Sequence, residues 1–512
     1  MTTNIVILIT IILYMVMMIF IGFSVADRNK TSGDFFLGGR RLGPFVTAMS
    51  AEASDMSGWL LMGLPAVALM GGIAEAAWTA IGLAIGTYIN WLVVAKRLRV
   101  YSQKIDAFTL PDFFAKRFGD NSKILTTVAA ILIIVFFIPY TASGFSACGK
   151  LFSTLFGMDY MTAMIISAIV IVLYCTLGGF LAASTTDFVQ SIVMTIALLV
   201  VVGFGANKAN GFSNVFANVQ SLDGYLNLFK GFDVASGTTG SYGALPVAST
   251  LAWGLGYFGM PHILLRFMAI EDKDKLKTSR RVASIWVVIS MAVAVLIGII
   301  GFSLMKIGIV PEYESTSAAE TIIVDIAKVI SNYGYIPAFV GGIILAGILA
   351  STMSTADSQL LAAASSVSQN LVQETAGIKL SQKKSMLLAR VSVIIISIIA
   401  VFLARNPDSS VFRIVSFAWA GFGAAFGPVV LCALFWKRTN KFGAVAGMIA
   451  GGITVFVWKF LIRTKFAGTV LDIYELLPAF IIGLIFIVAV SLITKAPEKE
   501  ITDKFEEVKA SV

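Results

Sequence analysis

Charged residues are scarce in this sequence: Asp, Glu, Lys and Arg make up only 13% of its 512 residues. Soluble domains carry about 25%. The mean hydropathy is +0.88, and the apolar residues fall into blocks of about 20, the length that crosses a hydrocarbon core of about 30 Å. The lack of charge therefore argues against a soluble protein and predicts one that crosses a membrane many times.

Cysteine, histidine and the common catalytic motifs are also nearly absent. Cys148, Cys175 and Cys432 lie within apolar blocks without metal or disulfide spacing, which indicates buried free thiols. His262 is the only histidine and has no neighbour for a proton relay. The sequence has no phosphate loop, no HExxH motif, no Ser paired with Lys or His, and no Arg-rich voltage sensor. We therefore expect no enzyme activity, no ATP drive and no cofactor.

The apolar blocks predict thirteen membrane helices. A helix satisfies its own backbone hydrogen bonds in lipid, whereas barrel strands would show short alternating segments that this sequence lacks. The first block has neither a basic start nor a cleavage site, which is typical of a spanning helix rather than of a signal peptide. The expected spans cover residues 4–26, 44–70, 74–95, 124–149, 160–182, 187–206, 245–265, 282–305, 336–371, 388–404, 411–436, 442–462 and 470–494.

The basic residues predict which way the chain crosses. The net charge of +9 comes from short loops between apolar blocks, which favours cytoplasmic loops beside membrane lipid and argues against a nucleic-acid partner. With the N-terminus outside, 28 of the 38 Lys and Arg residues fall inside and ten outside. We therefore expect a multi-pass protein of the cytoplasmic membrane, with its N-terminus outside and its C-terminus in the cytoplasm.

The second expected span carries polar residues that a membrane helix does not need. Its stretch from Ser50 to Trp59 reads SAEASDMSGW. A carboxylate such as Asp55 is costly in a membrane and indicates function. A helix break at Ser57-Gly58 would free backbone carbonyls, which with a nearby carboxylate suit a small cation. The alternative is a packing seam of small residues.

The seventh expected span is the second that looks interrupted. Three glycines and a proline fall within ten residues, from Trp253 to His262. Two broken helices in corresponding halves of a chain indicate a transporter site at the bilayer midplane. Half-helix N-termini could hold a substrate carboxylate without a fixed Arg or Lys, and the central spans contain neither. The alternative is a merely kinked helix.

The ninth expected span has a row of hydroxyl groups. Ser351, Ser354, Thr355 and Ser358 are spaced to share one helix face. They could supply neutral oxygens to a cation, or they could bond back to carbonyls of the preceding turn. Asp357 lies round the helix from Thr355 and would face a cytoplasmic exit path or pair with a loop arginine.

Single residues elsewhere leave similar alternatives open. Asp187 would cap the N-terminus of span six or belong to an ion exit route. Tyr140, next to a helix-loosening proline, would bond substrate or lie in the core. Arg40 and Arg41 would set topology or belong to the site.

Several of these stretches together resemble the sodium/solute symporter family, and within it the bacterial sodium/proline symporters, over nearly the whole chain. The stretches that carry the resemblance are FLGGRRLGPFVTAMSAEASDMSGWLLMGLP, LRVYSQKIDAFTLPDFFAKRF, STTDFVQ, WGLGYFGMPHILLRFMA, MSTADSQLL and SFAWAGFGAAFGPVVLCALFW. The resemblance implies an all-α polytopic protein with two inverted five-helix repeats, a LeuT-like core whose repeats each begin with a discontinuous helix, and three peripheral helices.

The resemblance also divides the chain. The two repeats would be 44–206 (spans two to six) and 245–436 (spans seven to eleven), joined by an extracellular loop, 207–244. Residues 1–43 would form the first helix and a cytoplasmic loop. Residues 437–495 would form the two last, peripheral spans. The connection 307–335 looks structured and external. The charged tail 496–512 has little to bury, which predicts a mobile helix or disorder.

Site roles are implied by the same resemblance. Sodium ligands would be the carbonyls of Ala53, Met56 and Ser351 and the hydroxyls of Ser354 and Thr355. Similar sequences often have Ala where this one has Ser351, a change that a backbone ligand tolerates. Sodium coupling would involve Asp55, Ser57, Gly58, Asp187 and Arg40. Substrate contacts would be Tyr140, Trp253, Tyr257 and Pro261.

The sequence thus predicts a secondary transporter that couples sodium to import of a small amino acid by alternating access. The resemblance implies L-proline as the solute and sodium as the co-transported ion, and the aromatic residues of span seven suit a secondary ammonium and an apolar ring. Another solute, such as a betaine, pantothenate or a sugar, is an alternative of the same class. A membrane sensor and a channel are alternatives of other classes.

Overall fold

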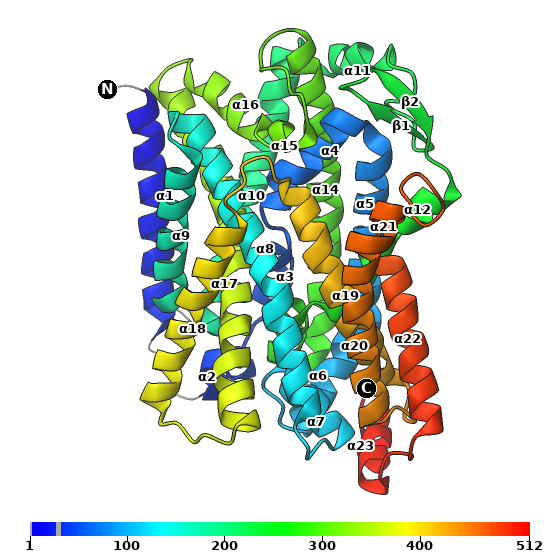
Figure 1. The fold of residues 1–512 in the computed structure, drawn as a ribbon. Helices are drawn as coiled ribbons and strands as arrows, with labels where there is room; N and C mark the ends of the chain where they lie inside the picture. Colours follow the sequence, from blue (N-terminus) through cyan, green and yellow to red (C-terminus); the bar gives the residue numbers. More distant parts are fainter. Residues whose placement is uncertain (1–2, 27–31, 178) are drawn as a thin grey trace.

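The computed structural model describes residues 3–26, 32–177 and 179–512. Most helices run along one common direction and form a bundle, with the N-terminus at one end and the C-terminus at the other (Figure 1). We call the end that carries Thr3, α11 and the β-hairpin the hairpin end, and the end that carries α2, α7 and α23 the tail end. Arg28 and Lys30, two of the basic residues that predict orientation, lie outside the described residues.

The first part of the chain contains both long and interrupted helices. The elements are α1 (Thr3–Ala26), α2 (Ser32–Leu37), a 3₁₀ turn (Gly38–Arg40), α3 (Pro44–Asp55), a π-helical turn (Trp59–Gly63), α4 (Leu64–Gly71), α5 (Ile73–Ile89), a π-helical turn (Asn90–Val94), α6 (Ala95–Lys104), α7 (Leu110–Phe118), α8 (Ile124–Phe156), α9 (Tyr160–Leu177), α10 (Phe180–Lys208) and α11 (Phe212–Gln220).

A short antiparallel hairpin, β1 (Lys230–Asp233) and β2 (Thr238–Ser241), precedes the second part. The elements that follow are α12 (Ala244–Leu251), a 3₁₀ stretch (Ala252–Gly259), α13 (Pro261–Ala269), a 3₁₀ turn (Lys273–Lys275), α14 (Leu276–Lys306), α15 (Thr316–Ala319), α16 (Ile322–Ser331), α17 (Tyr335–Ser365), a π-helical stretch (Ser366–Thr375), α18 (Gln382–Leu403), α19 (Val411–Phe435), α20 (Lys441–Val457), a π-helical turn (Trp458–Ile462), α21 (Arg463–Lys465), α22 (Leu476–Ile493) and α23 (Lys499–Ala510).

The number of spans depends on how broken helices are counted. Within the described residues, ten helices are long and apolar enough to cross a membrane, and the bent pair α3 and α4 makes eleven. The other two predicted spans correspond to α9, which is shorter, and to the region 244–269, which is divided into three helical pieces. The chain is therefore a multi-pass membrane protein, while the count of thirteen stays a prediction.

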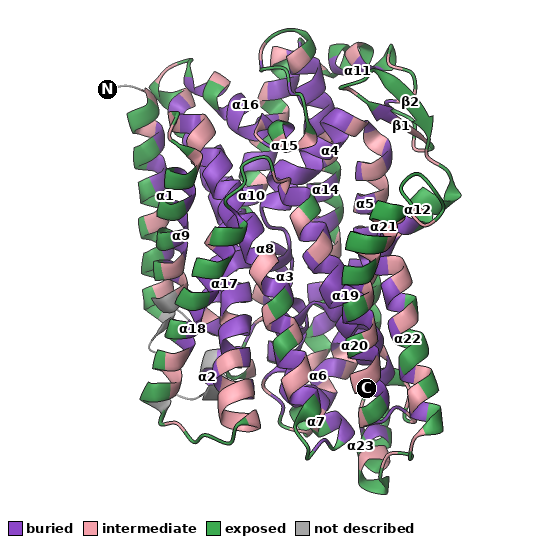
Figure 2. Ribbon diagram, viewed as in Figure 1, coloured by how far each residue is buried: buried purple, intermediate pink, exposed green. Residues whose placement is uncertain are grey.

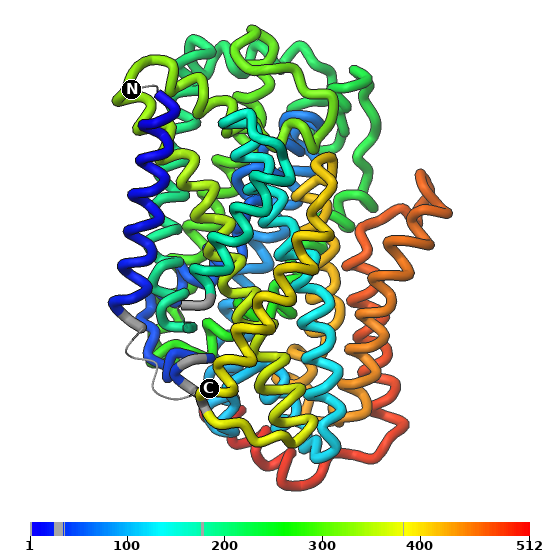
Figure 3. The backbone as a smooth tube through the Cα atoms, turned by 60° about the vertical axis from the view of Figure 1, so that its left-hand side comes forward, coloured from blue at the N-terminus to red at the C-terminus, as the bar shows by residue number. Residues whose placement is uncertain are grey.

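Burial separates the helices into a core and a surrounding layer. Figure 2 shows buried residues concentrated on α3, α8, α17 and α19, and exposed residues along α1, α18 and α22. Of the apolar span in α19, 89% is buried, whereas α1 has 28% buried. Figure 3 shows α20 and α21 reaching out from the rest of the bundle. The helices with little burial present apolar side chains outward, as lipid contact requires.

Three expectations about local structure were wrong. Span six begins at Phe180 rather than at residue 187, so Asp187 lies inside a helix and does not cap its start. The tail does have side chains to bury: its residues form the helix α23, which lies against α6 and buries Phe505 and Val508. The central spans do contain an arginine, because α13 continues past residue 265 and Arg266 is buried within it.

Candidate functional site: two interrupted helices and a hydroxyl-bearing helix

The first interruption separates α3 from α4 by a bend of 61°. α3 ends at Asp55, and Met56 leaves helical geometry with φ −81° and ψ 69°. Space is tight here: a Cβ on Gly58 would lie 2.8 Å from the Ala147 Cβ. The absence of a side chain at Gly58 therefore lets α8 approach the break. Because α3 ends at Asp55, the last carbonyls of α3 have no N–H partners within the helix.

Hydroxyl groups of α17 face these carbonyls. The Ser354 Oγ donates a hydrogen bond of 2.7 Å to the Ala53 carbonyl, and the Thr355 Oγ1 lies 3.5 Å from the same oxygen. Both hydroxyls also lie within 3.2 Å of the Ser351 carbonyl. Four of the five predicted sodium ligands thus share one cluster of neutral oxygens, all on buried residues.

The remaining ligand and the rest of the hydroxyl row behave differently. Met56 lies at the helix break itself, and its Sδ accepts a hydrogen bond of 3.6 Å from Ser290. The Ser351 hydroxyl donates back to the Ile348 carbonyl at 2.8 Å, so only its backbone faces the cluster. The hydroxyls of Ser351, Ser354 and Thr355 thus all bond back to a carbonyl of their preceding turn, and those of Ser354 and Thr355 also reach the Ala53 carbonyl of α3.

Asp55 joins this cluster to the second interruption. Its Oδ2 accepts a hydrogen bond of 2.6 Å from the Tyr257 hydroxyl, and its backbone carbonyl accepts one of 3.1 Å from the Tyr140 hydroxyl. The carboxylate is fully buried, and its Oδ1 has no hydrogen-bond partner. A buried anionic oxygen without a donor is costly, and a cation bound beside it would offset that cost.

The second interruption is longer and is lined by aromatic rings. Residues 252–259 form a 3₁₀ stretch, and α13 begins at Pro261, which has no N–H to satisfy. Close approach requires glycine: a Cβ on Gly254 would lie 2.3 Å from the Gly82 carbonyl, and one on Gly256 would lie 1.9 Å from the Trp419 Nε1. This stretch therefore packs against α5 and α19 too closely for side chains larger than hydrogen.

Trp253 stands at the centre of an aromatic group. Its ring stacks on Tyr474 at a centroid distance of 5.2 Å and lies 5.2 Å from Phe412 and 6.0 Å from Trp59. Its carbonyl accepts the Trp419 indole N–H at 2.8 Å. Three predicted substrate residues, Tyr140, Tyr257 and Trp253, therefore lie around the two breaks, while Pro261 sets the start of α13.

Known proteins are similar to this chain in sequence. The model of the sodium:solute symporter family matches residues 35–451. The osmoregulated proline transporter OpuE of Bacillus subtilis is 41% identical over 496 residues, which cover 96% of each chain. The sodium/proline symporter of Escherichia coli is 41% identical over 506 residues, covering 98% of this chain and 96% of its own.

The chain belongs to the sodium:solute symporter family. It is a transporter rather than an enzyme, and sodium is its co-transported ion. A solved Na⁺-coupled sialic acid symporter in a substrate-bound outward-open state superimposes with a TM-score of 0.77 at 17% identity, covering 96% of this chain and 99% of that one. That likeness shows the fold, which is the LeuT-like arrangement that the family resemblance implies.

The symporter also contains a buried ion pair that sequence reasoning missed. Arg266 of α13 pairs with Asp187 of α10 at 3.1 Å, and the two side chains are 1% and 0% exposed. Ser50 donates to Asp187 at 2.7 Å and accepts from the Arg266 Nε at 3.0 Å. Arg266 donates further to Ser358 and to the His262 carbonyl. The cluster therefore connects four helices on the tail-end side of the breaks.

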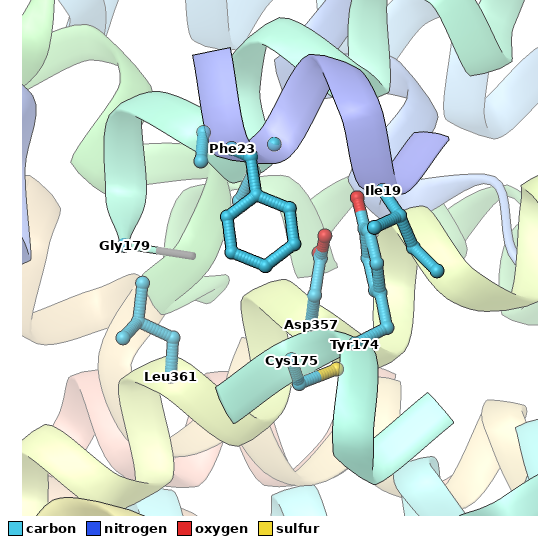
Figure 4. Close-up of a pocket in the computed structure, with 10 residues that line it drawn as sticks. Ile19, Phe23, Tyr174, Cys175, Gly179, Asp357 and Leu361 are labelled. Atoms are coloured by element: carbon cyan, nitrogen blue, oxygen red, sulfur yellow. The ribbon is translucent and has the colours of Figure 1, made fainter. Parts of the chain in front are cut away.

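Asp357 lies next to this cluster. Its Oδ1 accepts a hydrogen bond of 3.1 Å from Ser358, and its side chain lines a cavity of about 30 Å³ together with Tyr174 and Cys175 (Figure 4). That volume holds about one water molecule. The sequence left two alternatives for Asp357, a cytoplasmic exit path or pairing with a loop arginine. The structure places its side chain at a cavity on the tail-end side. The arginine of the neighbouring cluster, Arg266, lies in the helix α13 and not in a loop.

Arg40 binds backbone rather than an ion. Its guanidinium donates to the carbonyls of Met268 and Ala107, each at 2.7 Å, and to Ser102. Met268 follows Arg266 in α13, so Arg40 holds the end of that helix. Arg41 instead pairs with Asp34 at 2.9 Å. A coupling role for Arg40 would therefore act through the position of α13.

Proposed function

We propose that this symporter carries L-proline into the cell together with sodium, by alternating access around the two interrupted helices. The observation that carries the proposal is the contact of two α17 hydroxyls with the Ala53 carbonyl near the end of α3, close to the buried Asp55 carboxylate, which accepts a hydrogen bond from Tyr257 of the second break. The relatives that are 41% identical and named for proline transport support the choice of solute.

Sodium would bind the neutral oxygen cluster. The carbonyls of Ala53, Met56 and Ser351 and the hydroxyls of Ser354 and Thr355 are hard oxygen ligands, which suit a small cation. Asp55 would supply the negative charge that offsets the cost of dehydrating the ion. Ser57 and Gly58 would shape the turn, since the Ser57 N–H already donates to the Asp55 carbonyl at 2.9 Å.

Proline would lie against the second interruption. Its ring and secondary ammonium suit the faces of Trp253 and the tyrosines, and its carboxylate suits the first N–H groups of the half-helix that begins at Pro261. Tyr140 and Tyr257 both hydrogen-bond Asp55. A sodium ion beside Asp55 would compete with the Tyr257 hydroxyl for the Asp55 Oδ2. Tyr257 would then be free to turn toward the solute, and this would couple sodium binding to solute binding.

The driving force is adequate. One charge moving down a potential of 100 mV supplies about 2.3 kcal/mol before any concentration gradient is added. Asp187, held by Arg266, and Arg40, which holds the end of α13, would transmit sodium binding to the tail end. We also propose that the hairpin end faces outside and the tail end the cytoplasm, in line with the distribution of basic residues.

The test is reconstitution. Purified protein in liposomes should accumulate radiolabelled proline under an inward sodium gradient and should not do so under a potassium gradient. Uptake that is equal under both cations would remove the coupling, and sodium-driven uptake of a betaine but not of proline would change the solute. Labelling of an Ala248→Cys variant on intact cells with a membrane-impermeant maleimide tests the orientation, because Ala248 is exposed. Labelling is expected if the hairpin end faces outside, and its absence would contradict that orientation.

A further inference from the structure

An apolar groove of about 280 Å³ lies between α1, α9 and α17, at the edge of the bundle that α1 and α9 form (Figure 1). Its rim consists of exposed residues of α1 and α9, among them Ile12 and Ile166, each 50% exposed. Its floor consists of two buried residues of α17, Leu349 and Met353. The groove therefore leads from the outer surface of the bundle to the helix that carries the proposed sodium-binding hydroxyls.

The wall of this groove suits an apolar ligand and not water. Among the described residues that line it, Ser167 is the only one with a polar side chain, and its hydroxyl already donates to the Ala163 carbonyl at 2.8 Å. A buried water needs two to four polar partners, which the groove does not offer. An empty groove would leave its lining without dispersion contacts on one side. The chemistry of the wall therefore favours a hydrocarbon ligand.

The groove has nearly the depth of one membrane leaflet. On α9 it extends from Ala163 to Ile171, which is about 12 Å at the rise of an α-helix. One leaflet contributes about 15 Å, half of a hydrocarbon core of about 30 Å. Because α8 runs from α7 at the tail end to the hairpin end, α9 begins at the hairpin end. The groove thus extends from near the hairpin end toward the middle of the bundle, as an acyl chain of that leaflet does.

A lysine lies beside the hairpin-end part of the groove. Phe152 and Phe156 of α8 line the groove there, with their rings stacked at a centroid distance of 6.1 Å. Between them on the same helix, the Thr154 carbonyl accepts a hydrogen bond of 3.2 Å from the Lys328 Nζ. Lys328 is exposed, and an ammonium group has three donors. It can therefore donate to a phosphate oxygen at the level of the lipid headgroups.

We infer that this groove is a binding site for one glycerophospholipid of the leaflet at the hairpin end. One acyl chain fills the groove with its end on Leu349 and Met353, and the phosphate accepts a hydrogen bond from Lys328. The chain enters between exposed apolar residues of α1 and α9, so the groove continues the lipid-facing surface of these helices. The inference concerns the lipid alone and does not depend on which solute is transported.

Photolabelling of the full-length protein tests the site. The protein is placed in liposomes of phosphatidylglycerol that contain a small fraction of the same lipid with a diazirine at the end of one acyl chain. After irradiation, mass spectrometry of proteolytic fragments locates the labelled residues. Label should appear on Met353, which is 1% exposed and lies beyond the reach of lipid at the outer surface. The exposed residues of α22 are labelled by any surrounding lipid and serve as the internal reference.

Two tryptophan variants of α9 give the matched comparison. Ile166→Trp places a large ring at the rim of the groove and should remove most of the label from Met353. Ile169→Trp changes a residue that is 55% exposed and does not line the groove, so it should leave that label unchanged. Both side chains are exposed, so neither substitution should unfold the protein, and thermal unfolding in detergent checks this.

A second set of arms tests the phosphate contact. Lys328→Gln should lower the ratio of Met353 label to α22 label about two- to fivefold, in line with the loss of one exposed charge contact. Lys306→Gln should not, although Lys306 is an exposed lysine that also donates to a carbonyl, that of Asn218 at 2.9 Å. A diacylglycerol probe with the same diazirine chain lacks the phosphate and should give the lower ratio with the wild type.

Three results would overturn the inference. Label confined to exposed surfaces would show that lipid does not enter the groove. Met353 label that Ile166→Trp leaves unchanged would show that the chain arrives by another route. An equal ratio for the phosphatidylglycerol and diacylglycerol probes, unchanged in Lys328→Gln, would remove the phosphate contact and with it the assignment to a phospholipid.

Discussion

The two interrupted helices differ in what they expose. The break after Asp55 is short and sharp, with small residues, and beside it the Ala53 carbonyl oxygen faces the hydroxyls of Ser354 and Thr355. The stretch 252–259 is longer, and it presents the rings of Trp253 and Tyr257. The difference shows how the two breaks suit different ligands. A small ion requires oxygen atoms at fixed positions, whereas an organic solute with an apolar ring and an ammonium group packs on the faces of aromatic rings.

The largest expected effect is at the residue that joins the two breaks. Asp55→Asn should lower sodium-driven proline uptake at least about 100-fold, because losing a charge contact to the ion is worth about 3 kcal/mol. Uptake into liposomes, normalised to protein content, measures this. Glu52→Gln is the matched control, since it neutralises a buried carboxylate on the same helix but keeps an oxygen for the Trp91 N–H. Equal loss in both variants would contradict a special role for Asp55.

The second prediction concerns the connection between the halves. Arg266→Gln should destabilise the protein by about 3–5 kcal/mol, because it leaves Asp187 buried and unpaired. Thermal unfolding in detergent measures this. Adding Asp187→Asn should restore part of the lost stability, since the double variant buries no lone charge. A double variant less stable than Arg266→Gln would show that the pair does not act as a unit.

The third prediction tests the aromatic side of the comparison. Trp253→Ala should raise the proline dissociation constant about 10- to 30-fold, in line with the loss of a desolvated cation–π contact, with less than a twofold change for sodium. Equilibrium binding of each radiolabelled species measures the two constants. Trp253→Phe should recover most of the affinity, and Trp78→Phe, at the hairpin end, should have no effect. Equal weakening of both ligands would contradict the division between the breaks.

The fourth prediction sharpens the oxygen side. Ser354→Ala should raise the sodium concentration for half-maximal uptake about tenfold, which corresponds to 1.4 kcal/mol for one lost ligand. Ser351→Ala should change it less than twofold, because that hydroxyl bonds to Ile348 and only its carbonyl faces the cluster. A larger effect from Ser351→Ala than from Ser354→Ala would reverse the assignment.

Much of this site was predictable because intramembrane polarity is rare. The Asp55 and Ser57-Gly58 stretch, the glycines near Trp253 and the hydroxyl row of α17 stand out against apolar surroundings, and the structure brings them together. Arg266 was missed because it ends an apolar run and so looked like part of a loop. Only its partner Asp187, 79 positions earlier, makes it a core residue.

The tail shows a second limit of sequence reasoning. Its charge predicts a mobile helix or disorder with little to bury, but Phe505 packs beneath the guanidinium groups of Arg97 and Arg117, at 5.5 Å and 5.0 Å from its ring centre. Glu507 pairs with Lys104 at 3.0 Å. These partners lie about 400 positions away in the chain, so local composition contains no sign of them.

The most direct test of the account is sodium binding to the purified protein without proline. Radiolabelled sodium should bind saturably to the wild type, and a variant combining Ser354→Ala with Thr355→Val should lose that binding while its thermal unfolding stays unchanged. Sodium binding by the double variant with wild-type affinity would contradict the claim that these hydroxyls and the α3 carbonyls hold the ion.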